Sequence, residues 1–363
     1  MKLNTIKGYF NASKQSKKIL KERKLYFRPG KYRFSARHKK IYYLKNSNTE
    51  KFLSSLEKGY DFKKEEKVLF RLKEAMRILF LGLFSVNLNH TLNEFNGQIG
   101  MITIRGSTKI FDLEGKKVLT FFKENHEYQR IKIAYFNLSK YYNTTFIEFD
   151  DEKLYYSEHL IDFKPLNVWG EKEKEIVFDS IYNANKLYFN ECSKVHYEKM
   201  SVSKKINEWQ TKENLKKTIE NYKLLLQEVN LEIPVLTLHG DIHLNNILLS
   251  ENKVYFIDFE FSGEYFFFFD IFGLICQEPF CNSLSGERSY LISYIHGEYD
   301  FKLQELFKIL NFNYEPELKK EYFILCCLDW AAQNNRSEEK TIKILNLYDE
   351  IETNYKLLVS KNS

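Results

Sequence analysis

The segment 235–271 constrains the fold of this chain more than any other stretch. Its sequence is VLTLHGDIHLNNILLSENKVYFIDFEFSGEYFFFFDI. An apolar run leads into a polar loop, and two further apolar runs, 247–249 and 254–257, flank a Ser-Glu-Asn turn. The pattern predicts a strand, a loop and a β-hairpin whose second strand ends at Asp258.

The predicted hairpin brings two oxygen-bearing side chains to one end of a ribbon. Asn246 stands at the start of the first strand and Asp258 at the end of its partner. Asp241 lies in the adjoining loop. Amide and carboxylate oxygens suit Mg²⁺, which binds one or two carboxylates and completes its shell with water and phosphate oxygens. The pattern therefore indicates a site for a metal-bound nucleotide.

The spacing H-G-D-x-x-x-x-N, followed after a short hairpin by I-D-F-E, resembles the aminoglycoside and choline phosphotransferase branch of the protein-kinase-like superfamily. The resemblance is sharp from His239 to Asp270 and covers about residues 96–300 in the order of elements. It implies ATP and Mg²⁺ as cofactors. It also implies a two-lobed α+β fold, with a small antiparallel β-sheet N-lobe and a mainly helical C-lobe that carries the catalytic loop.

The resemblance implies a role for each matching residue. Asp241 corresponds to the catalytic aspartate that accepts the proton of the acceptor hydroxyl, and Asn246 and Asp258 correspond to the metal ligands. Glu260 replaces the glycine of the protein-kinase D-F-G, which argues against a protein kinase. Structural support of the catalytic loop is assigned to three further residues, His239, His243 and Asp270.

The lysine that binds nucleotide phosphates in this superfamily is missing from its usual place. That place, after two apolar strand residues, is held by Thr120. Lys123 is the nearest candidate for nucleotide binding, with Glu127 on the following helix as its ion-pair partner. Strand alternation sets Lys123 on the opposite face from Thr120, so an ordinary surface lysine is the alternative.

The hinge between the lobes is expected at residues 157–161. There the backbone of Glu158 and Leu160 would bind adenine. No GxGxxG motif covers the phosphates. Gly106-Ser107 would form a compact turn with backbone N–H groups for them, or it is a plain hairpin corner.

Three segments are expected along the chain: a basic N-terminal extension (1–95), a kinase-like N-lobe (96–160) and a helical C-lobe with the catalytic loop (161–363). Within them, alternation and turn residues predict strands over 26–34 and 40–45, and three- and four-residue spacing predicts a helix over 64–83. Three strands, a helix and two strands follow over 100–161. Helical spacing then covers two regions, 172–229 and 301–363.

The charge is unevenly distributed. Residues 1–46 hold 15 Lys and Arg against the single Glu22, which leaves a net charge of −8 on the remainder. Such a basic arm would dock on an anionic membrane surface or an acidic polymer, or it is a solvated arm. Nucleic acid is the weaker partner, since no recognised motif supports it.

Localisation follows from what the chain lacks. Its start has no apolar core, and its longest apolar stretch, 78–86, is too short to span a bilayer. The five cysteines have no CxxC spacing, which disfavours a zinc site and a disulfide framework. We expect a cytoplasmic protein that can attach peripherally to the inner face of the membrane.

The expected function is that of an ATP- and Mg²⁺-dependent phosphotransferase acting on a hydroxyl of a small molecule or glycan, such as a cell-envelope sugar or alcohol precursor. The alternative is a catalytically silent kinase-like module that binds nucleotide or a partner. The missing strand lysine and glycine loop favour the silent module, whereas Asp241, Asn246 and Asp258 favour the enzyme.

Overall fold

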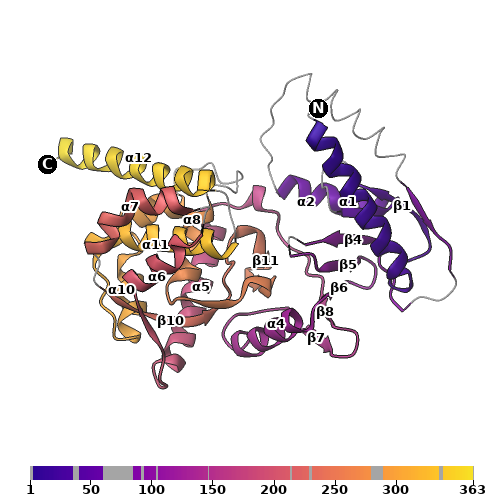
Figure 1. Cartoon of the computed structure of the whole chain (residues 1–363), viewed down its shortest axis with the longest axis horizontal. Coiled ribbons are helices and arrows are strands. Elements are labelled where there is room, and N and C mark those ends of the chain that lie inside the picture. The colour runs from indigo at the N-terminus through magenta and orange to yellow at the C-terminus, as the bar shows by residue number, and fades with distance from the viewer. Residues whose placement is uncertain are drawn as a thin grey trace. The chain divides into compact units, whose positions relative to one another are not determined.

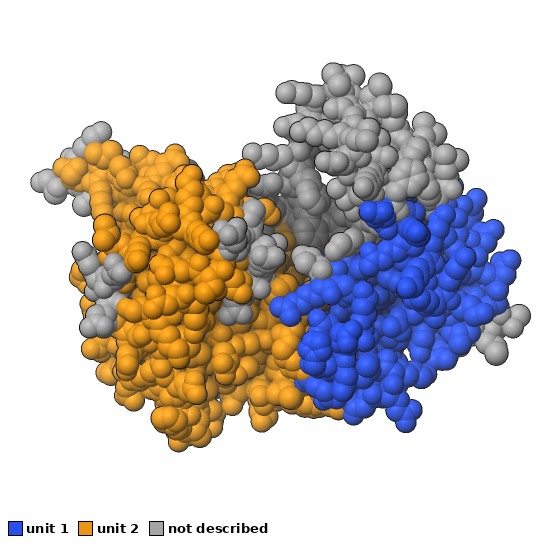
Figure 2. Space-filling model, in the orientation of Figure 1, with its two compact units in different colours: residues 1–129, 145–165 blue, residues 130–144, 166–363 orange. Residues whose placement is uncertain are grey.

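A computed structural model of the chain describes most of its length. The described residues are 3–35, 41–59, 85–90, 94–103, 105–145, 147–212, 215–228, 231–278, 289–334 and 338–362. The chain divides into two compact units, here called unit 1 (1–129 and 145–165) and unit 2 (130–144 and 166–363; Figure 2). Unit 1 is built on an antiparallel sheet and unit 2 mainly on helices, so the predicted α+β class is confirmed.

The described residues of unit 1 form one sheet of eight strands in the order β3-β1-β2-β4-β5-β6-β8-β7, and each neighbouring pair is antiparallel (Figure 1). Helices α1 (Leu3–Glu22) and α2 (Ser47–Gly59) belong to this unit, whereas α4 (Asn125–Leu138) begins in unit 1 and ends in unit 2. The strands are β1 (Gly30–Phe34), β2 (Ile41–Leu44), β3 (Val86–Leu88), β4 (Ile99–Ile102), β5 (Thr108–Asp112), β6 (Lys117–Phe121), β7 (Ile147–Asp150) and β8 (Tyr155–His159).

The order of elements predicted for residues 100–161 is confirmed, since β4, β5, β6, α4, β7 and β8 follow one another there. The two predicted N-terminal strands are also present as β1 and β2. Strand β1 starts later than predicted because Pro29 has no N–H to donate, and Lys24–Tyr26 form a 3₁₀ turn instead. The helix predicted over 64–83 lies outside the described residues.

The sheet is continuous across residue 95, where the sequence prediction divides the extension from the N-lobe. Strand β2 pairs with β4, with Ile41 opposite Met101 and Tyr43 opposite Ile99. The first 95 residues therefore contribute strands to the same sheet as the predicted N-lobe. The three-segment division stays a prediction about domains.

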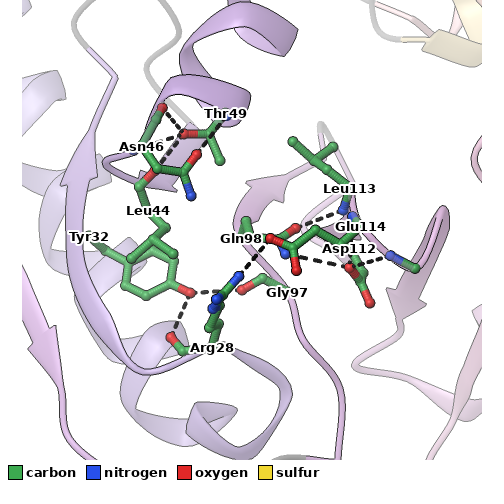
Figure 3. Close-up of polar contacts among 11 residues, drawn as sticks. Arg28, Tyr32, Leu44, Asn46, Thr49, Gly97, Gln98, Asp112, Leu113 and Glu114 are labelled. Carbon is green, nitrogen blue, oxygen red and sulfur yellow. Dashed lines mark hydrogen bonds and ion pairs between the residues drawn. The ribbon is translucent and has the colours of Figure 1, made fainter.

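Polar contacts attach β1 and the residue segment before it to Gly97 and to the turn between β5 and β6 (Figure 3). The Tyr32 hydroxyl donates to the carbonyl oxygen of Gly97 at 2.7 Å, and Arg28 Nη1 donates to Glu114 Oε1 at 2.6 Å. Asp112 Oδ1 accepts the N–H of Glu114 at 3.1 Å and so closes the turn. The exposed Arg28–Glu114 pair contributes at most about 1 kcal/mol, so the buried Tyr32 bond is the stronger constraint.

Helix α1 packs against one face of this sheet. Its residues Ile19 and Leu20 are buried in a cluster with Ile110, Leu119 and Phe121 from the central strands. Over its described residues the basic segment 1–46 thus folds as a helix, a 3₁₀ turn and two strands. Its exposed lysines include Lys14, Lys18, Lys21, Lys24 and Lys31.

Unit 2 is mainly helical, as predicted for 172–229 and 301–363. A three-stranded sheet (β13-β10-β9) and the β11–β12 hairpin complete it. Its helices are α5 (Glu171–Cys192), α6 (Val202–Gln210), α7 (Lys216–Glu228), α8 (Phe269–Gln277), α9 (Tyr290–Ile295), α10 (Asp300–Ile309), α11 (Lys319–Asn334) and α12 (Glu338–Asn362). Its strands are β9 (Lys199–Ser201), β10 (Glu232–Leu238), β11 (Ile247–Ser250), β12 (Lys253–Phe256) and β13 (Gly263–Phe266).

The four phenylalanines from Phe266 to Phe269 lie in the core of unit 2, which confirms the burial expected of adjacent aromatic rings. Phe267 packs edge-on against Phe307, with ring centroids 4.6 Å apart. In the described part of the chain no helix has the length and apolar character needed to cross a membrane.

A buried carboxyl in unit 2 makes stability depend on pH. Glu278, just after α8, is 2% exposed, and its Oε1 lies 3.9 Å from Lys174 Nζ. Loss of hydration raises the pKa of Glu278 from 4.5 to about 7. Between pH 4.5 and about 7 the folded chain holds a proton that the unfolded chain has lost. The free energy of unfolding therefore declines as the pH rises through this range, and the contribution is lost above pH 7.

Glu278→Gln is therefore expected to remove this decline, because the amide is neutral at every pH. The shift corresponds to about 3 kcal/mol, so the variant should gain stability relative to the natural protein by up to that amount between about pH 5 and pH 8. Urea unfolding at both pH values measures the difference. The exposed Glu339→Gln is the matched control, and an effect of Glu278→Gln that is equal at both pH values contradicts the prediction.

Candidate functional site

Strand β10 leads directly into the loop that holds Asp241, whose side chain is buried. Gly240 precedes it with φ of +78°, a conformation that residues with a Cβ rarely adopt. A Cβ at this position would lie 2.3 Å from the carbonyl oxygen of Phe261 and 2.5 Å from the hydroxyl of Tyr265. The loop thus requires glycine both for its conformation and for space.

Gly240→Ala is expected to destabilise the protein by about 2–4 kcal/mol, since it combines a strained φ with a steric overlap. Chemical denaturation measures the loss. Gly263→Ala is the matched control, because a Cβ there would come no closer than 3.6 Å to a neighbouring atom. Equal effects of the two substitutions would show that the loop does not depend on this glycine.

Asp270, in the first turn of α8, fastens the backbone of the loop. Its Oδ2 accepts the N–H of His239 and its Oδ1 accepts the N–H of Gly240, both at 2.9 Å. The Tyr142 hydroxyl donates to Oδ2 at 3.2 Å. Burial raises the pKa of Asp270, and these three donors oppose that rise by stabilising the carboxylate. The geometry agrees with the supporting role predicted for Asp270, which stays a prediction.

The ring of His239 is fully buried behind the loop. Its Nε2 lies 3.1 Å from the carbonyl oxygen of Ile257, and since a carbonyl only accepts, Nε2–H is the donor. The ring packs against Phe259, with centroids 4.5 Å apart. Burial lowers the pKa of His239, against the influence of Asp270 and Asp241. His239 is therefore a neutral imidazole that joins the Asp241 loop to the strand before Asp258.

Asp241 is held by two side chains from its own loop. Asn246 Nδ2 donates to Asp241 Oδ2 at 2.9 Å and to its backbone oxygen at 3.0 Å. His243 Nε2 lies 3.5 Å from the same Oδ2, and its Nδ1 accepts the N–H of Asn245 at 3.1 Å. The two residues fix the orientation of the Asp241 carboxylate.

The predicted hairpin is confirmed, with Ile247 of β11 opposite Phe256 of β12. The N–H of Ile257 donates to the backbone oxygen of Asn246 at 3.1 Å, so the pairing continues to the residue before Asp258. Asp258 has φ of +70° and ψ of +66°. A non-glycine residue pays about 1–3 kcal/mol for such a conformation, and residues held in it occur at functional sites as well as in turns.

Sequence reasoning missed one residue that holds the segment after Asp258. Arg130 of α4 donates from Nη1 to the carbonyl oxygen of Ser262 and from Nη2 to that of Glu260, both at 2.6 Å. These bonds fix the backbone on both sides of Phe261. No local pattern identifies Arg130, because its partners lie about 130 positions further along the chain.

Lys123 and Glu127, the two side chains predicted to bind nucleotide phosphates, form no ion pair with each other in the part of the chain that the structure describes. Lys123 follows the end of β6 and is exposed, and Glu127 is half-buried in the first turn of α4. Gly106, at the corner between β4 and β5, has φ of +91°, and its N–H donates to the backbone oxygen of Thr103 at 3.2 Å. A phosphate-binding role for Lys123 and Glu127 stays a prediction.

The predicted hinge residues belong to unit 1. The Glu158 side chain is buried and accepts the Thr145 hydroxyl at 3.0 Å. The N–H of Leu160 donates to the backbone oxygen of Lys116 at 2.9 Å, so an adenine contact from Leu160 would use its carbonyl oxygen or replace this bond. Adenine binding by these two backbones stays a prediction. A cavity of about 350 Å³ adjoins the segment, lined among others by Phe52, Leu113, Lys116, Leu160, Ile161 and Phe163.

Three comparisons relate the chain to known proteins. Residues 115–281 match the family model described as choline/ethanolamine kinase. No curated protein matches the chain. The chain is similar to an ethanolamine kinase from Plasmodium vivax, with 15% identity, a TM-score of 0.41 and coverage of 84% of this chain and 94% of that chain.

Two further solved structures are similar to the chain. One is a choline kinase from Streptococcus pneumoniae, with 13% identity, a TM-score of 0.40 and coverage of 69% of this chain and 90% of that chain. The other is a thermostable mutant of an aminoglycoside phosphotransferase, with 11% identity, a TM-score of 0.44 and coverage of 68% of this chain and 90% of that chain.

The family match spans the whole of the H-G-D loop, the hairpin and Asp258. It falls on the residues from which the resemblance is inferred. The chain is thus confirmed to resemble the aminoglycoside and choline phosphotransferase branch of the protein-kinase-like superfamily.

Proposed function

We propose that the chain is an ATP- and Mg²⁺-dependent phosphotransferase that phosphorylates a hydroxyl of a small molecule or glycan. The observation that carries the proposal is the buried Asp241 carboxylate, oriented by Asn246 at the same hairpin end as Asp258. The match of residues 115–281 to a choline/ethanolamine kinase model supports the same class of reaction.

In this proposal Asp241 accepts the proton of the acceptor hydroxyl. The acceptor oxygen then bonds to the γ-phosphorus while the bond from that phosphorus to the β–γ bridging oxygen breaks, and ADP leaves. Asn246 and His243 hold the carboxylate through Oδ2, so its orientation is set before the acceptor binds. Such preorganisation supplies much of the rate in a reaction that depends on positioning and charge neutralisation.

The donor set fits a Mg²⁺ ion. Nδ2 of Asn246 is directed to Asp241, so the amide Oδ1 points to the other side of the planar group. This oxygen and the Asp258 carboxylate would hold the ion, with water and phosphate oxygens as the remaining ligands. In the described residues no cluster of three or more His, Cys, Asp or Glu side chains has the arrangement of a metal site. When bound, the ion would neutralise charge on the transferred phosphoryl group.

The acceptor we propose is a sugar or alcohol of a cell-envelope precursor, and the place of action is the cytoplasm at the inner face of the membrane. The support is the basic surface of α1, the 3₁₀ turn after it and β1, because exposed lysines attract anionic lipid headgroups. That surface includes Lys14, Lys18, Lys21, Lys24 and Lys31.

Thermal unfolding with ATP, GTP or no nucleotide, each with and without Mg²⁺, tests the proposal. A ligand that binds only the folded chain raises its apparent stability, by about 2.7 kcal/mol at a hundredfold excess over Kd. We expect a rise that requires both nucleotide and Mg²⁺. The absence of any rise at millimolar nucleotide would contradict the proposal.

The second candidate is a catalytically silent kinase-like module. It is favoured by Thr120, a short neutral side chain at the place of the phosphate-binding lysine. A silent module would keep its biological effect when Asp241 is replaced by Asn, whereas an enzyme would lose it.

A further inference from the structure

Strand β5 carries a lysine in an unusual environment. Lys109 is 6% exposed, and lysine is among the residues that are least often buried in folded proteins. Among the lysines of unit 1 whose side chains the structure describes, Lys109 alone is buried.

The register of the sheet puts Lys109 beside the position of the missing lysine. In the antiparallel pair of β5 and β6, Lys109 lies directly opposite Thr120. Residues directly opposite each other point to the same face, with Cβ atoms about 4.5–5.5 Å apart. The ammonium of Lys109, on its flexible four-carbon stem, can therefore reach the space that a lysine at position 120 would occupy.

The packing of the sheet identifies this face. Ile110 and Leu119, the neighbours of Lys109 and Thr120 along their strands, are buried under α1 on one face of the sheet. Alternation sends Lys109 and Thr120 to the other face. Glu158 of the predicted hinge lies on that face too, since it is opposite Val118, two residues before Thr120. Lys109 and Glu158 thus lie on the same face of the sheet.

Thr120 leaves room for this side chain. It is shorter than lysine, and its buried hydroxyl makes no hydrogen bond to the residues that the structure describes. Lys109 is buried and lies within a strand, whereas Lys123 is exposed and lies beyond the end of β6.

We propose that Lys109 supplies, from β5, the ammonium that binds the nucleotide phosphates, in place of the lysine that Thr120 replaces on β6. The inference rests on the proposed phosphotransferase function. It replaces Lys123 as the phosphate-binding candidate and removes the main argument for a silent module. The lysine would then stand on β5 and the neutral residue opposite it on β6, the reverse of the arrangement expected from the family resemblance.

The experiment compares Lys109→Met with Lys123→Met. Isothermal titration measures the Kd of each variant for Mg²⁺-ATP and for adenosine, which lacks the phosphates. Methionine keeps a long apolar stem in the buried site and removes only the charge. Losing a charge-assisted hydrogen bond to phosphate should weaken ATP binding about 10- to 100-fold and leave adenosine binding unchanged. If Lys109 is the phosphate-binding group, Lys123→Met should weaken ATP binding much less than Lys109→Met does.

A second variant, Lys109→Thr with Thr120→Lys, exchanges the two residues between the opposite positions of β5 and β6 and keeps the composition of the pair. It should restore most of the affinity for ATP. This variant also tests the proposal if Lys109→Met fails to fold. Unfolding temperatures without nucleotide show which variants are folded.

Four results would overturn the inference. The first three are ATP affinity unchanged in Lys109→Met, a loss in Lys123→Met instead, and a folded exchange variant that does not bind ATP. The fourth is equal weakening of ATP and adenosine, which would indicate a purely structural lysine. If the natural protein itself binds no Mg²⁺-ATP, the proposed function fails together with it.

Discussion

Asp241→Asn is expected to lower the rate of phosphoryl transfer about 10²–10⁴-fold, the usual contribution of a positioned general base. The amide cannot accept the acceptor's proton, but its oxygen can still accept the hydrogen bond from Asn246. The loop should therefore keep its structure. Stabilisation by Mg²⁺-ATP should stay close to that of the natural protein, so the loss would appear in kcat rather than in nucleotide binding.

Transfer is measured as ADP release that depends on an acceptor. Asn246→Ala is a useful comparison, because it removes both the predicted metal ligand and the bond that orients Asp241, and should impair nucleotide binding and turnover together. A variant with Asn at position 241 that retains full turnover would exclude Asp241 as the base.

Asp258→Ala is expected to abolish the Mg²⁺-dependent part of the stabilisation by ATP, which for the natural protein is about 2.7 kcal/mol at a hundredfold excess over Kd. The reason is that the variant loses the carboxylate that would hold the ion against the phosphates. Thermal unfolding with and without Mg²⁺ measures the effect.

Asp258→Asn is the matched control for this prediction. Asparagine tolerates the positive φ of 70° at this position, so the variant keeps the backbone and removes only the charge. It should bind Mg²⁺-ATP more weakly than the natural protein. Stabilisation by Mg²⁺-ATP that survives in both variants would place the metal elsewhere.

The structure of the segment that holds Asp241 and Asp258 could be predicted from the sequence because its determinants are local. The hairpin follows from two apolar runs around a short turn, and the contacts of Asp241 with Asn246 span five residues. Asp270 is 30 positions from Gly240, yet the intervening hairpin returns the chain to the loop. Because the interacting residues are close in sequence, residue type and spacing were enough to predict this part of the structure.

The N-terminal helix could not be predicted, because its buried stripe is weakly apolar. Ser13, Ser16, Ile19 and Leu20 are all buried on α1, and the two serines interrupt the hydrophobic period. Lysines on the outer side then give the segment the composition of a solvated arm. Tertiary packing on the sheet determines this helix.

Lys109 and Arg130 were missed for a different reason. The role proposed for Lys109 depends on its register with Thr120 on the next strand. The hydrogen bonds of Arg130 are made to carbonyl groups about 130 residues away. Neither relation leaves a spacing that a single sequence displays. The sequence points to Lys123 because it lies three positions after Thr120, just beyond the end of β6.

The most direct test of the phosphotransferase is the transfer of the γ-phosphate itself. The natural protein and Asp241→Asn are incubated with Mg²⁺-ATP and a panel of sugars, amino alcohols and polyols, and phosphorus NMR follows the formation of phosphate esters. We predict that the natural protein forms an ester on at least one hydroxyl compound and that Asp241→Asn does not. Nucleotide binding without ester formation, equal in the two proteins across the panel, would contradict the enzyme and favour the silent module.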